Sequence, residues 1–174
     1  MIDFNGKVPK ILVIGDLMVD HYLWGSCDRI SPEAPVQVVN VKKESIVLGG
    51  AGNVINNLQS LGAHVDILSV IGVCKVSKEL TEMIKDIKVD TKYLITQDDR
   101  ITSKKTRIIA AHQQVVRYDI ESNDEIDNNS QTSLLQTFNA LIKSFDLVLL
   151  SDYGKGVLTF DLTQSIIKSA KHNQ

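Results

Sequence analysis

A regular succession of glycines, apolar segments and one asparagine constrains the fold of this chain more than any other feature. Gly49 and Gly50 precede an amphipathic stretch that ends at Gly62, and Gly72 closes the next apolar run. This order predicts a tight turn, a helix, a second turn and a strand. Glycine lets backbone approach a small ligand closely, and Asn53 stands at the predicted helix entry, where N–H groups converge. We therefore expect a small-molecule site at this helix start.

Apolar runs typical of buried strands alternate with helical patterns along the chain. Strands are predicted over residues 10–14, 65–71 and 147–150, and helices over residues 53–61, 78–87, 134–142 and 160–170. Because strands that alternate with helices form a parallel sheet covered on both sides, the sequence predicts an α/β fold with helices on both faces.

Two β-rich inserts interrupt this alternation. Short strands are predicted over residues 22–24, 36–41, 105–110 and 114–118. They suit a small exposed sheet better than a buried core. We therefore expect a separate β lid built from inserts at about residues 22–41 and 93–118.

Composition excludes several classes of protein. The chain has 174 residues, which predicts one domain, and its net charge of −2 gives no reason to expect nucleic acid or a membrane surface as partner. No apolar run is long enough to span a membrane. Cys27 and Cys74 lack metal-ligand spacing and predict free thiols in a reducing compartment, so we expect a cytoplasmic protein with no metal site of its own.

The glycine succession resembles the signature of the ribokinase family of carbohydrate kinases. That signature runs Gly-Gly, a small residue, Asn, and two further glycines at intervals of about ten residues, and residues 49–72 follow it except at Ile55, where the family has a small residue. The sequence Gly-Asp-Leu-Met-Val-Asp at residues 15–20 resembles the first-strand motif of the family. The resemblance implies that Asp20 holds sugar hydroxyls.

Two more segments narrow the resemblance. Arg-Ile-Ser-Pro-Glu-Ala-Pro-Val at residues 29–36 and Ser-Asp-Tyr-Gly-Lys-Gly at residues 151–156 are similar to the D-glycero-D-manno-heptose 7-phosphate kinases of lipopolysaccharide synthesis. Those kinases are often the first half of a bifunctional kinase/adenylyltransferase. The resemblance implies a ribokinase-like parallel sheet with a β lid, ATP and Mg²⁺ as cofactors, a sugar-phosphate substrate and a homodimer formed through the lid.

The motifs that bind nucleotide in this family do not occur in the chain. The family carries a Gly-Ala-Gly-Asp motif with the catalytic base, and no Gly-x-Gly-Asp sequence is present here. We therefore expect residues 1–174 to be the N-terminal portion of one sugar-kinase domain, with the C-terminal half missing. The catalytic base would lie outside this chain, which we expect to be inactive alone.

Eight residues are candidates for contacting the substrate: Asp20, Gly49, Gly50, Asn53, Lys105, Arg107, Asp152 and Lys155. Lys105 and Arg107 share one face of an alternating strand and are placed to clamp a phosphate, with Arg29 as a further candidate. Asp152 and Lys155 follow a buried strand, where open α/β sheets bind ligands.

Each candidate also has an ordinary structural explanation. Asp20 would also suit a turn cap at a strand end, and Asn53 a helix cap, although we favour ligand contact for both. The lid cations suit a solvated sheet face, and Asp152 and Lys155 suit a solvated loop.

The leading hypothesis is ATP-dependent phosphorylation of D-glycero-D-manno-heptose 7-phosphate at the anomeric hydroxyl, which gives the 1,7-bisphosphate. Two alternatives stay open. One is another ribokinase-type sugar kinase, and the other is a non-catalytic remnant that binds sugar phosphates or dimerises.

Overall fold

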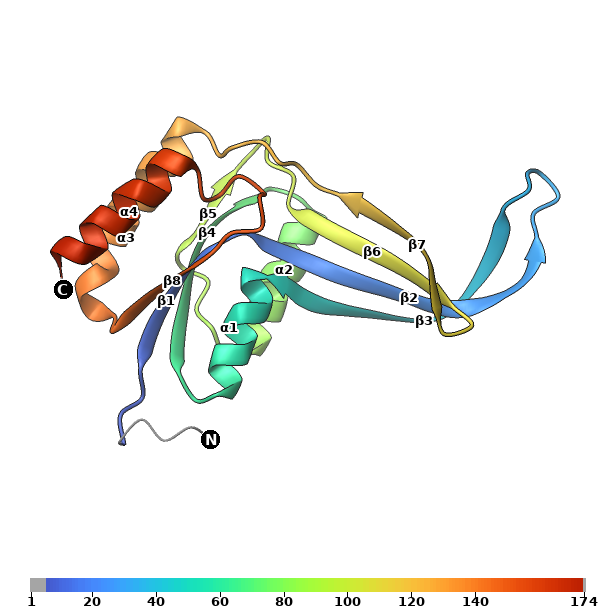
Figure 1. Ribbon diagram of the computed structural model, residues 1–174, viewed down its shortest axis with the longest axis horizontal. Coiled ribbons are helices and arrows are strands. Elements are labelled where there is room, and N and C mark those ends of the chain that lie inside the picture. Colours follow the sequence, from blue (N-terminus) through green and yellow to red (C-terminus); the bar gives the residue numbers. More distant parts are fainter. Residues whose placement is uncertain (1–5, 174) are drawn as a thin grey trace.

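The computed structural model describes residues 6–173, which form a body and a projecting lid (Figure 1). The body sheet is parallel and has the strand order β5-β4-β1-β8, with β1 at Lys10–Gly15, β4 at His64–Gly72, β5 at Leu94–Gln97 and β8 at Leu147–Ser151. Four helices pack on it, α1 at Ala51–Ser60, α2 at Lys75–Asp86, α3 at Asn128–Leu141 and α4 at Phe160–His172, and a short 3₁₀ turn, η1 at Ile142–Ser144, follows α3.

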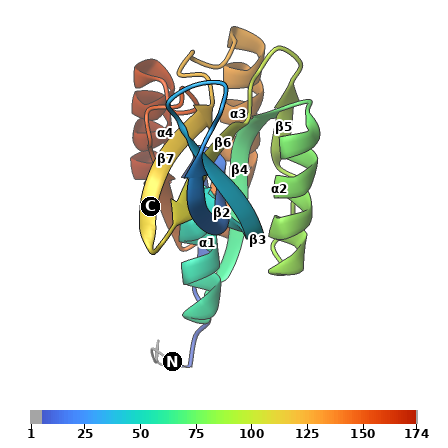
Figure 2. The ribbon, with the colours of Figure 1, turned by 90° about the vertical axis from the view of Figure 1, so that its right-hand side faces the viewer.

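Alternation along β1 divides the body core into two layers. Ile11 and Val13 face a cluster that includes Ile55 of α1 and Leu80 of α2. The intervening strand residues face a second cluster, which includes Phe138 of α3. Helices therefore cover both faces of the parallel sheet, as the sequence predicts, and Figure 2 shows α2 and α4 on opposite sides of the strands.

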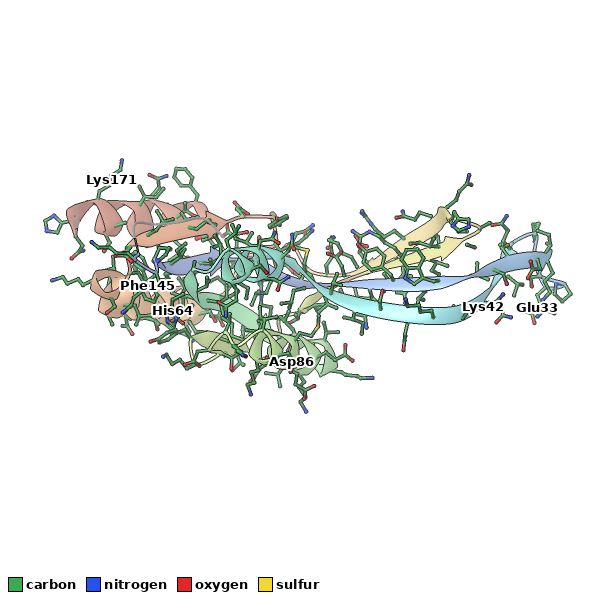
Figure 3. The ribbon with its side chains drawn as sticks, turned by 90° about the horizontal axis from the view of Figure 1, so that it is seen from below. Glu33, Lys42, His64, Asp86, Phe145 and Lys171 are labelled. Atoms are coloured by element: carbon green, nitrogen blue, oxygen red, sulfur yellow. The ribbon has the colours of Figure 1, made fainter. Side chains whose placement is uncertain are left out.

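The lid sheet has the order β3-β2-β6-β7, with β2 at Leu17–Ile30, β3 at Gln37–Gly50, β6 at Ser103–Ala110 and β7 at Gln113–Ile120. Strand β2 pairs antiparallel with β3 and parallel with β6. Figure 3 shows Glu33 and Lys42 at the far end of this sheet, away from His64 and Phe145 on the body.

The lid is larger than the sequence predicted. The short strands expected at residues 22–24 and 36–41 are parts of β2 and β3, each of which has 14 residues. Much of β3 is exposed, so its polar side chains hide the alternation that marks a half-buried strand. The expected insert at 93–118 also proved wrong at its start, because β5 pairs with β4 in the body sheet.

Helices α1, α2 and α3 also start earlier than the apolar pattern indicated, whereas α4 starts at Phe160 as predicted. The first turn of α3 is polar, and it forms because the Asp127 side chain accepts a hydrogen bond from the Ser130 N–H at 2.6 Å. Helix α1 begins at Ala51, directly after the glycine pair. Its first turn therefore points at the junction between body and lid.

Candidate functional site

A polar cavity of about 420 Å³ lies at that junction. Six of the eight candidate residues line it: Asp20, Gly49, Gly50, Asn53, Lys105 and Arg107. The other lining residues are Met18, Tyr22, Val47, Leu48, Arg117 and Tyr153. Segments far apart in the sequence thus meet here, as the glycine and strand motifs predict.

Both residues of the glycine pair have to be glycine, because neighbouring atoms leave no room for a Cβ. A Cβ atom on Gly49 would collide with the Asp20 carboxylate and with Met18 at 2.8 Å. Gly50 has a φ of 55°, and a Cβ there would collide with the Asp16 carbonyl. Glycine therefore lets the turn lie directly against the Asp20 carboxylate.

Asp20 and Asn53 do not have the structural roles that offered alternatives to ligand contact. Asp20 lies inside β2, paired with Val47 and Lys105, rather than at a strand end. The N-cap of α1 is Gly50, and no side chain caps this helix. Asn53 instead presents an exposed side chain from the first turn, where the partial positive charge of the helix start faces the cavity.

Arg107 lies on the cavity face of β6 and pairs with Asp20. Its guanidinium donates to Asp20 Oδ1 at 2.5 Å and lies 5.3 Å from the centre of the Tyr22 ring. The hydrogen bond that Arg107 donates to Asp20 raises the pKa of Arg107 above its ordinary value. This cation is part of a structured cavity wall, which distinguishes it from a solvated sheet face.

Lys105 lies beside Arg107 on the same face, with 15% of its side chain exposed. Its ammonium donates to Glu121 at 2.6 Å and to Asp119 at 3.0 Å. Burial acts against the charged form, but the hydrogen bonds to Glu121 and Asp119 outweigh it and raise the pKa of Lys105. The lysine therefore stays charged with two carboxylate partners.

Asp152 and Lys155 lie beside the cavity and do not line it. The Asp152 carboxylate accepts the Gly154 N–H at 2.8 Å in an exposed turn. The Lys155 ammonium donates to Glu121 at 2.7 Å and to Asn123 at 2.7 Å. Glu121 thus joins Lys155 to Lys105. The hydrogen bonds that these two lysines donate lower the pKa of Glu121 below its ordinary value.

Two other lid cations are not gathered at the cavity. Arg29 pairs with Val38 near the far end of the hairpin. Lys104 faces the opposite side of the sheet, where its ammonium lies 3.7 Å from Glu79. Neither is among the residues that line the cavity.

Sequence reasoning missed four residues of the region: Asp16, Tyr22, Glu121 and Tyr153. Tyr22 follows Asp20 by two residues on a strand, so alternation alone places it on the same face. Tyr153 lies inside the quoted loop motif. Asp16 is 1% exposed and accepts three backbone N–H bonds, from Tyr153, Lys155 and Val157, a role that no local pattern predicts.

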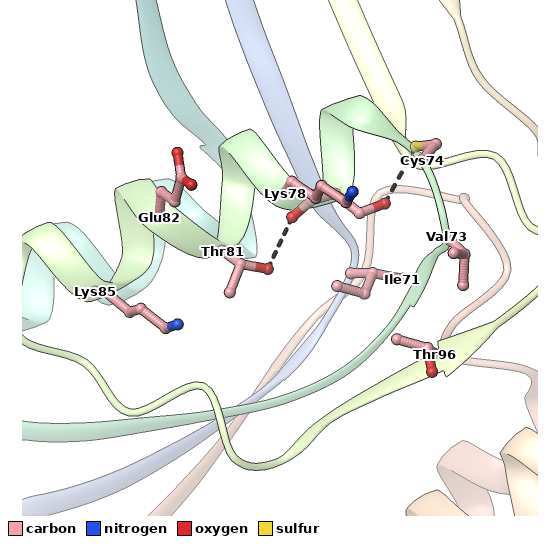
Figure 4. Close-up of a pocket in the computed structure, with 10 residues that line it drawn as sticks. Ile71, Val73, Cys74, Lys78, Thr81, Glu82, Lys85 and Thr96 are labelled. Carbon is pink, nitrogen blue, oxygen red and sulfur yellow. Dashed lines mark hydrogen bonds between the residues drawn. The ribbon is translucent and has the colours of Figure 1, made fainter.

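A second cavity, of about 350 Å³, lies between α2 and β5 (Figure 4). It is lined mainly by apolar atoms and by residues such as Ile71, Cys74, Lys78 and Thr96. Burial opposes ionisation of the Cys74 thiol, but hydrogen bonding with Ser77 lowers its pKa. None of the eight candidate residues lines this cavity, so the junction cavity is the candidate sugar site.

Residues 8–174 match the family model described as pfkB family carbohydrate kinase, and the chain belongs to that family. Use of ATP and Mg²⁺ is general in the family. Within residues 6–173, no helix is long and apolar enough to cross a membrane.

Two curated relatives that share a name are similar to most of this chain. The chain is 61% identical over 167 residues to "Bifunctional protein HldE" of Aliarcobacter butzleri, an alignment that covers 96% of this chain and 35% of that protein. It is 52% identical over 165 residues to the protein of the same name from Sulfurimonas denitrificans, again covering 35% of it. The chain thus spans about a third of the length of these relatives.

Solved structures share the fold at low sequence identity. A putative phosphofructokinase from Staphylococcus aureus superposes with a TM-score of 0.74 at 13% identity, covering 94% of this chain and 50% of that one. Arabidopsis thaliana ribokinase, complexed with ribose and ATP, gives a TM-score of 0.63 at 13% identity, covering 96% and 51%. The match confirms the predicted ribokinase-like fold, and this chain corresponds to about half of each kinase.

Proposed function

We propose that residues 1–174 are the N-terminal, sugar-binding portion of one carbohydrate-kinase domain that phosphorylates D-glycero-D-manno-heptose 7-phosphate. The product would be the 1,7-bisphosphate, formed in the cytoplasm on the route to ADP-heptose and lipopolysaccharide. One observation carries the proposal: Asp20 lies against the glycine turn while two cations, Lys105 and Arg107, line the same cavity. The name shared by the curated relatives supports the choice among sugar kinases.

Each group has a distinct role in substrate binding. The Asp20 carboxylate is an acceptor and suits sugar hydroxyls, and the backbone at Gly49 and Gly50 lets the sugar approach closely. Arg107 and Lys105 suit the 7-phosphate, because a guanidinium binds phosphate with two parallel hydrogen bonds. Both cations already hold carboxylates, so the phosphate would bind by exchanging with Asp20 and Glu121 as their partner.

Asp152 and Lys155 stay predictions as substrate contacts. Lys155 is joined to the cavity cations through Glu121, so release of Glu121 would leave its ammonium beside Lys105. Asp152 would have to leave its turn with Gly154 to reach a sugar.

We propose no site for ATP or Mg²⁺ among residues 6–173, which the structure describes. Residues 6–173 contain no group of three or more His, Cys, Asp or Glu residues that could hold a metal ion. The carboxylates of Asp20 and Glu121 already have cationic partners. Asp20 binds Arg107, and Glu121 binds two lysines. We therefore assign sugar binding to this chain and no step of phosphoryl transfer.

We also propose that the lid forms a homodimer. Ile46, Val116, Tyr118 and Ile120 are exposed on the lid face opposite the cavity cations, which gives that face apolar area for a second copy. Light scattering would show a dimer for the chain and a monomer for Tyr118→Glu. A monomeric wild-type protein at micromolar concentration would contradict the dimer and leave the sugar site untouched.

A fused enzyme tests the proposed activity. Residues 1–174 would be joined to the remainder of the kinase portion of the Aliarcobacter butzleri relative, and this protein is called the completed kinase below. We expect ADP release with heptose 7-phosphate, Mg²⁺ and ATP, and loss of that turnover in Asp20→Asn, since the amide is no longer an ionised acceptor. Asp86→Asn, an exposed change on α2, is the matched control.

The same assay separates the alternatives. Turnover of ribose or fructose 6-phosphate in preference to heptose 7-phosphate would assign the chain to another ribokinase-type kinase. Binding of heptose 7-phosphate by the 174-residue chain, with no turnover of any sugar by the completed kinase, would favour the non-catalytic remnant.

A further inference from the structure

Asp16 connects the two walls of the junction cavity without lining it. Its N–H donates to the carbonyl of Ser151, the last residue of β8, at 3.0 Å. Its carbonyl accepts the N–H of Ala51, the first residue of α1, at 2.9 Å. The main chain of this one residue therefore ties the end of β8 to the glycine turn.

The Asp16 side chain holds the loop that follows β8. Oδ2 accepts the N–H groups of Tyr153 at 2.8 Å and Lys155 at 3.1 Å, and Oδ1 accepts that of Val157 at 3.1 Å. Bonds to an ionised acceptor are roughly twice as strong as neutral ones. Because every second residue donates, the loop curls around a carboxylate that is 1% exposed.

Two further observations show that this loop is built around the carboxylate. Gly154 and Gly156 have φ values of 65° and 82°, which reverse the chain between the donating residues. Behind the loop, Arg100 donates to the carbonyl of Lys155 at 2.5 Å. Tyr153, the first donor, lines the cavity together with Gly49 and Gly50.

We propose that Asp16 is a positioning residue that presets the sugar cavity by fixing the backbone of Tyr153 against the glycine turn. The inference rests on the proposed function, since it assigns a role within the same sugar site. A carboxylate is needed because it offers acceptors to all three N–H groups. An asparagine of the same shape would direct its NH₂ group toward at least one N–H and lose that bond.

Two measurements on the completed kinase test this role, with Asp16→Asn compared with Asp66→Asn. Asp66 is a matched control, since it is also buried on a strand of the body sheet but does not line the cavity. Hydrogen exchange of residues 153–157 should rise at least tenfold in Asp16→Asn only. The KM for heptose 7-phosphate should rise roughly tenfold to a hundredfold, while the KM for ATP stays within about twofold.

A double substitution separates positioning from a general structural effect. In a Tyr153→Ala background, Asp16→Asn should raise the sugar KM by less than half of its effect in the wild type, because the side chain that the fixed backbone holds at the cavity is already gone. Full additivity, or an equal rise in the KM for ATP, would overturn the inference.

The exchange measurement does not depend on the substrate. If the completed kinase does not accept heptose 7-phosphate, the proposed function fails, and unchanged exchange at residues 153–157 would separately overturn the role of Asp16. Asp16→Ala, which removes both acceptor oxygens, should raise exchange at these residues further than Asp16→Asn does. Failure of both Asp16 variants to fold, with ordinary melting of Asp66→Asn, would mean a global role and would also overturn the inference.

Discussion

Arg107 and Asp20 hold each other across the neighbouring strands β6 and β2, with the guanidinium 2.5 Å from the carboxylate. The residue proposed for the sugar hydroxyls and the residue proposed for the phosphate are therefore one ion pair. Under the proposed function, substrate binding would exchange the partners of this pair, and substitutions on either side should affect both functions.

Arg107→Ala should weaken sugar-phosphate binding by the completed kinase more than ATP binding. Loss of one charge-assisted contact costs about 1.5–3 kcal/mol, or roughly tenfold to a hundredfold in the KM for heptose 7-phosphate. Arg107→Lys should recover only part of this, because an ammonium lacks the planar fork. The test is steady-state kinetics with each substrate varied in turn. Lys42→Ala, at the exposed end of the lid, is the control. Equal rises in both KM values would assign Arg107 to the lid structure instead.

Gly49→Ala should abolish most sugar binding while the protein stays folded. The added methyl group would collide with the Asp20 carboxylate and with Met18, so Asp20 must move. Gly52→Ala is the control, because its Cβ would lie against Leu48 and Leu17 and not against Asp20, the nearest atom being Leu48 Cβ at 3.1 Å, and alanine favours a helix. Calorimetric titration with heptose 7-phosphate measures the difference, and equal affinity in the two variants would show that the turn does not contact the site.

Glu121→Gln should destabilise the protein by about 1 kcal/mol near neutral pH and have little effect in acid. Hydrogen bonds from Lys105 and Lys155 hold the pKa of Glu121 below its ordinary value of 4.5. A group whose folded pKa is depressed stabilises the fold above its unfolded pKa, and this contribution disappears as the pH falls through the folded pKa. Urea unfolding at pH 7 and below pH 4, with exposed Glu82→Gln as control, measures both limits. A difference that persisted in acid would rule out the ionised bridge as its cause.

Residues 1–174 alone should not turn over ATP with heptose 7-phosphate. The chain spans 35% of the Aliarcobacter butzleri relative and contains no Gly-x-Gly-Asp sequence. Positioning and electrostatic stabilisation supply most of the rate of phosphoryl transfer, so their absence is a large loss. A coupled ADP assay that showed rates on the order of 1 per second would contradict this expectation.

The sequence predicted most of the body and six lining residues of the cavity, because both depend on local signals. Apolar runs mark β1 and β4, and glycines that leave room for a neighbour mark the turn at Gly49. The lid extended further than predicted, since its exposed strands lack a buried face to set a pattern. Strand β5 was missed because it has only four residues and none of them is fully buried, so it shows neither an apolar run nor a clear alternation.

Side-chain partners were the part of the site that sequence could not supply. Alternation placed Lys105 and Arg107 on one face of the strand. No local sequence pattern showed that these cations bind the carboxylates of Asp20 and Glu121. Asp16 is separated from Tyr153 by 137 residues, so its role appears only once β1 and β8 are side by side.

The long strands β2 and β3 run from the cavity to the tip of the lid. Asp20 and Gly49 belong to β2 and β3 themselves, so no hinge loop separates the sugar contacts from the projecting sheet. The pairing register shifts at Trp24/Gly25 and at Cys27/Arg29, both on the far side of the cavity residues. Bulges are where a ribbon bends most easily. We therefore expect the lid to bend at these bulges, so that movement of its tip leaves the strand register at Asp20 and Gly49 unchanged.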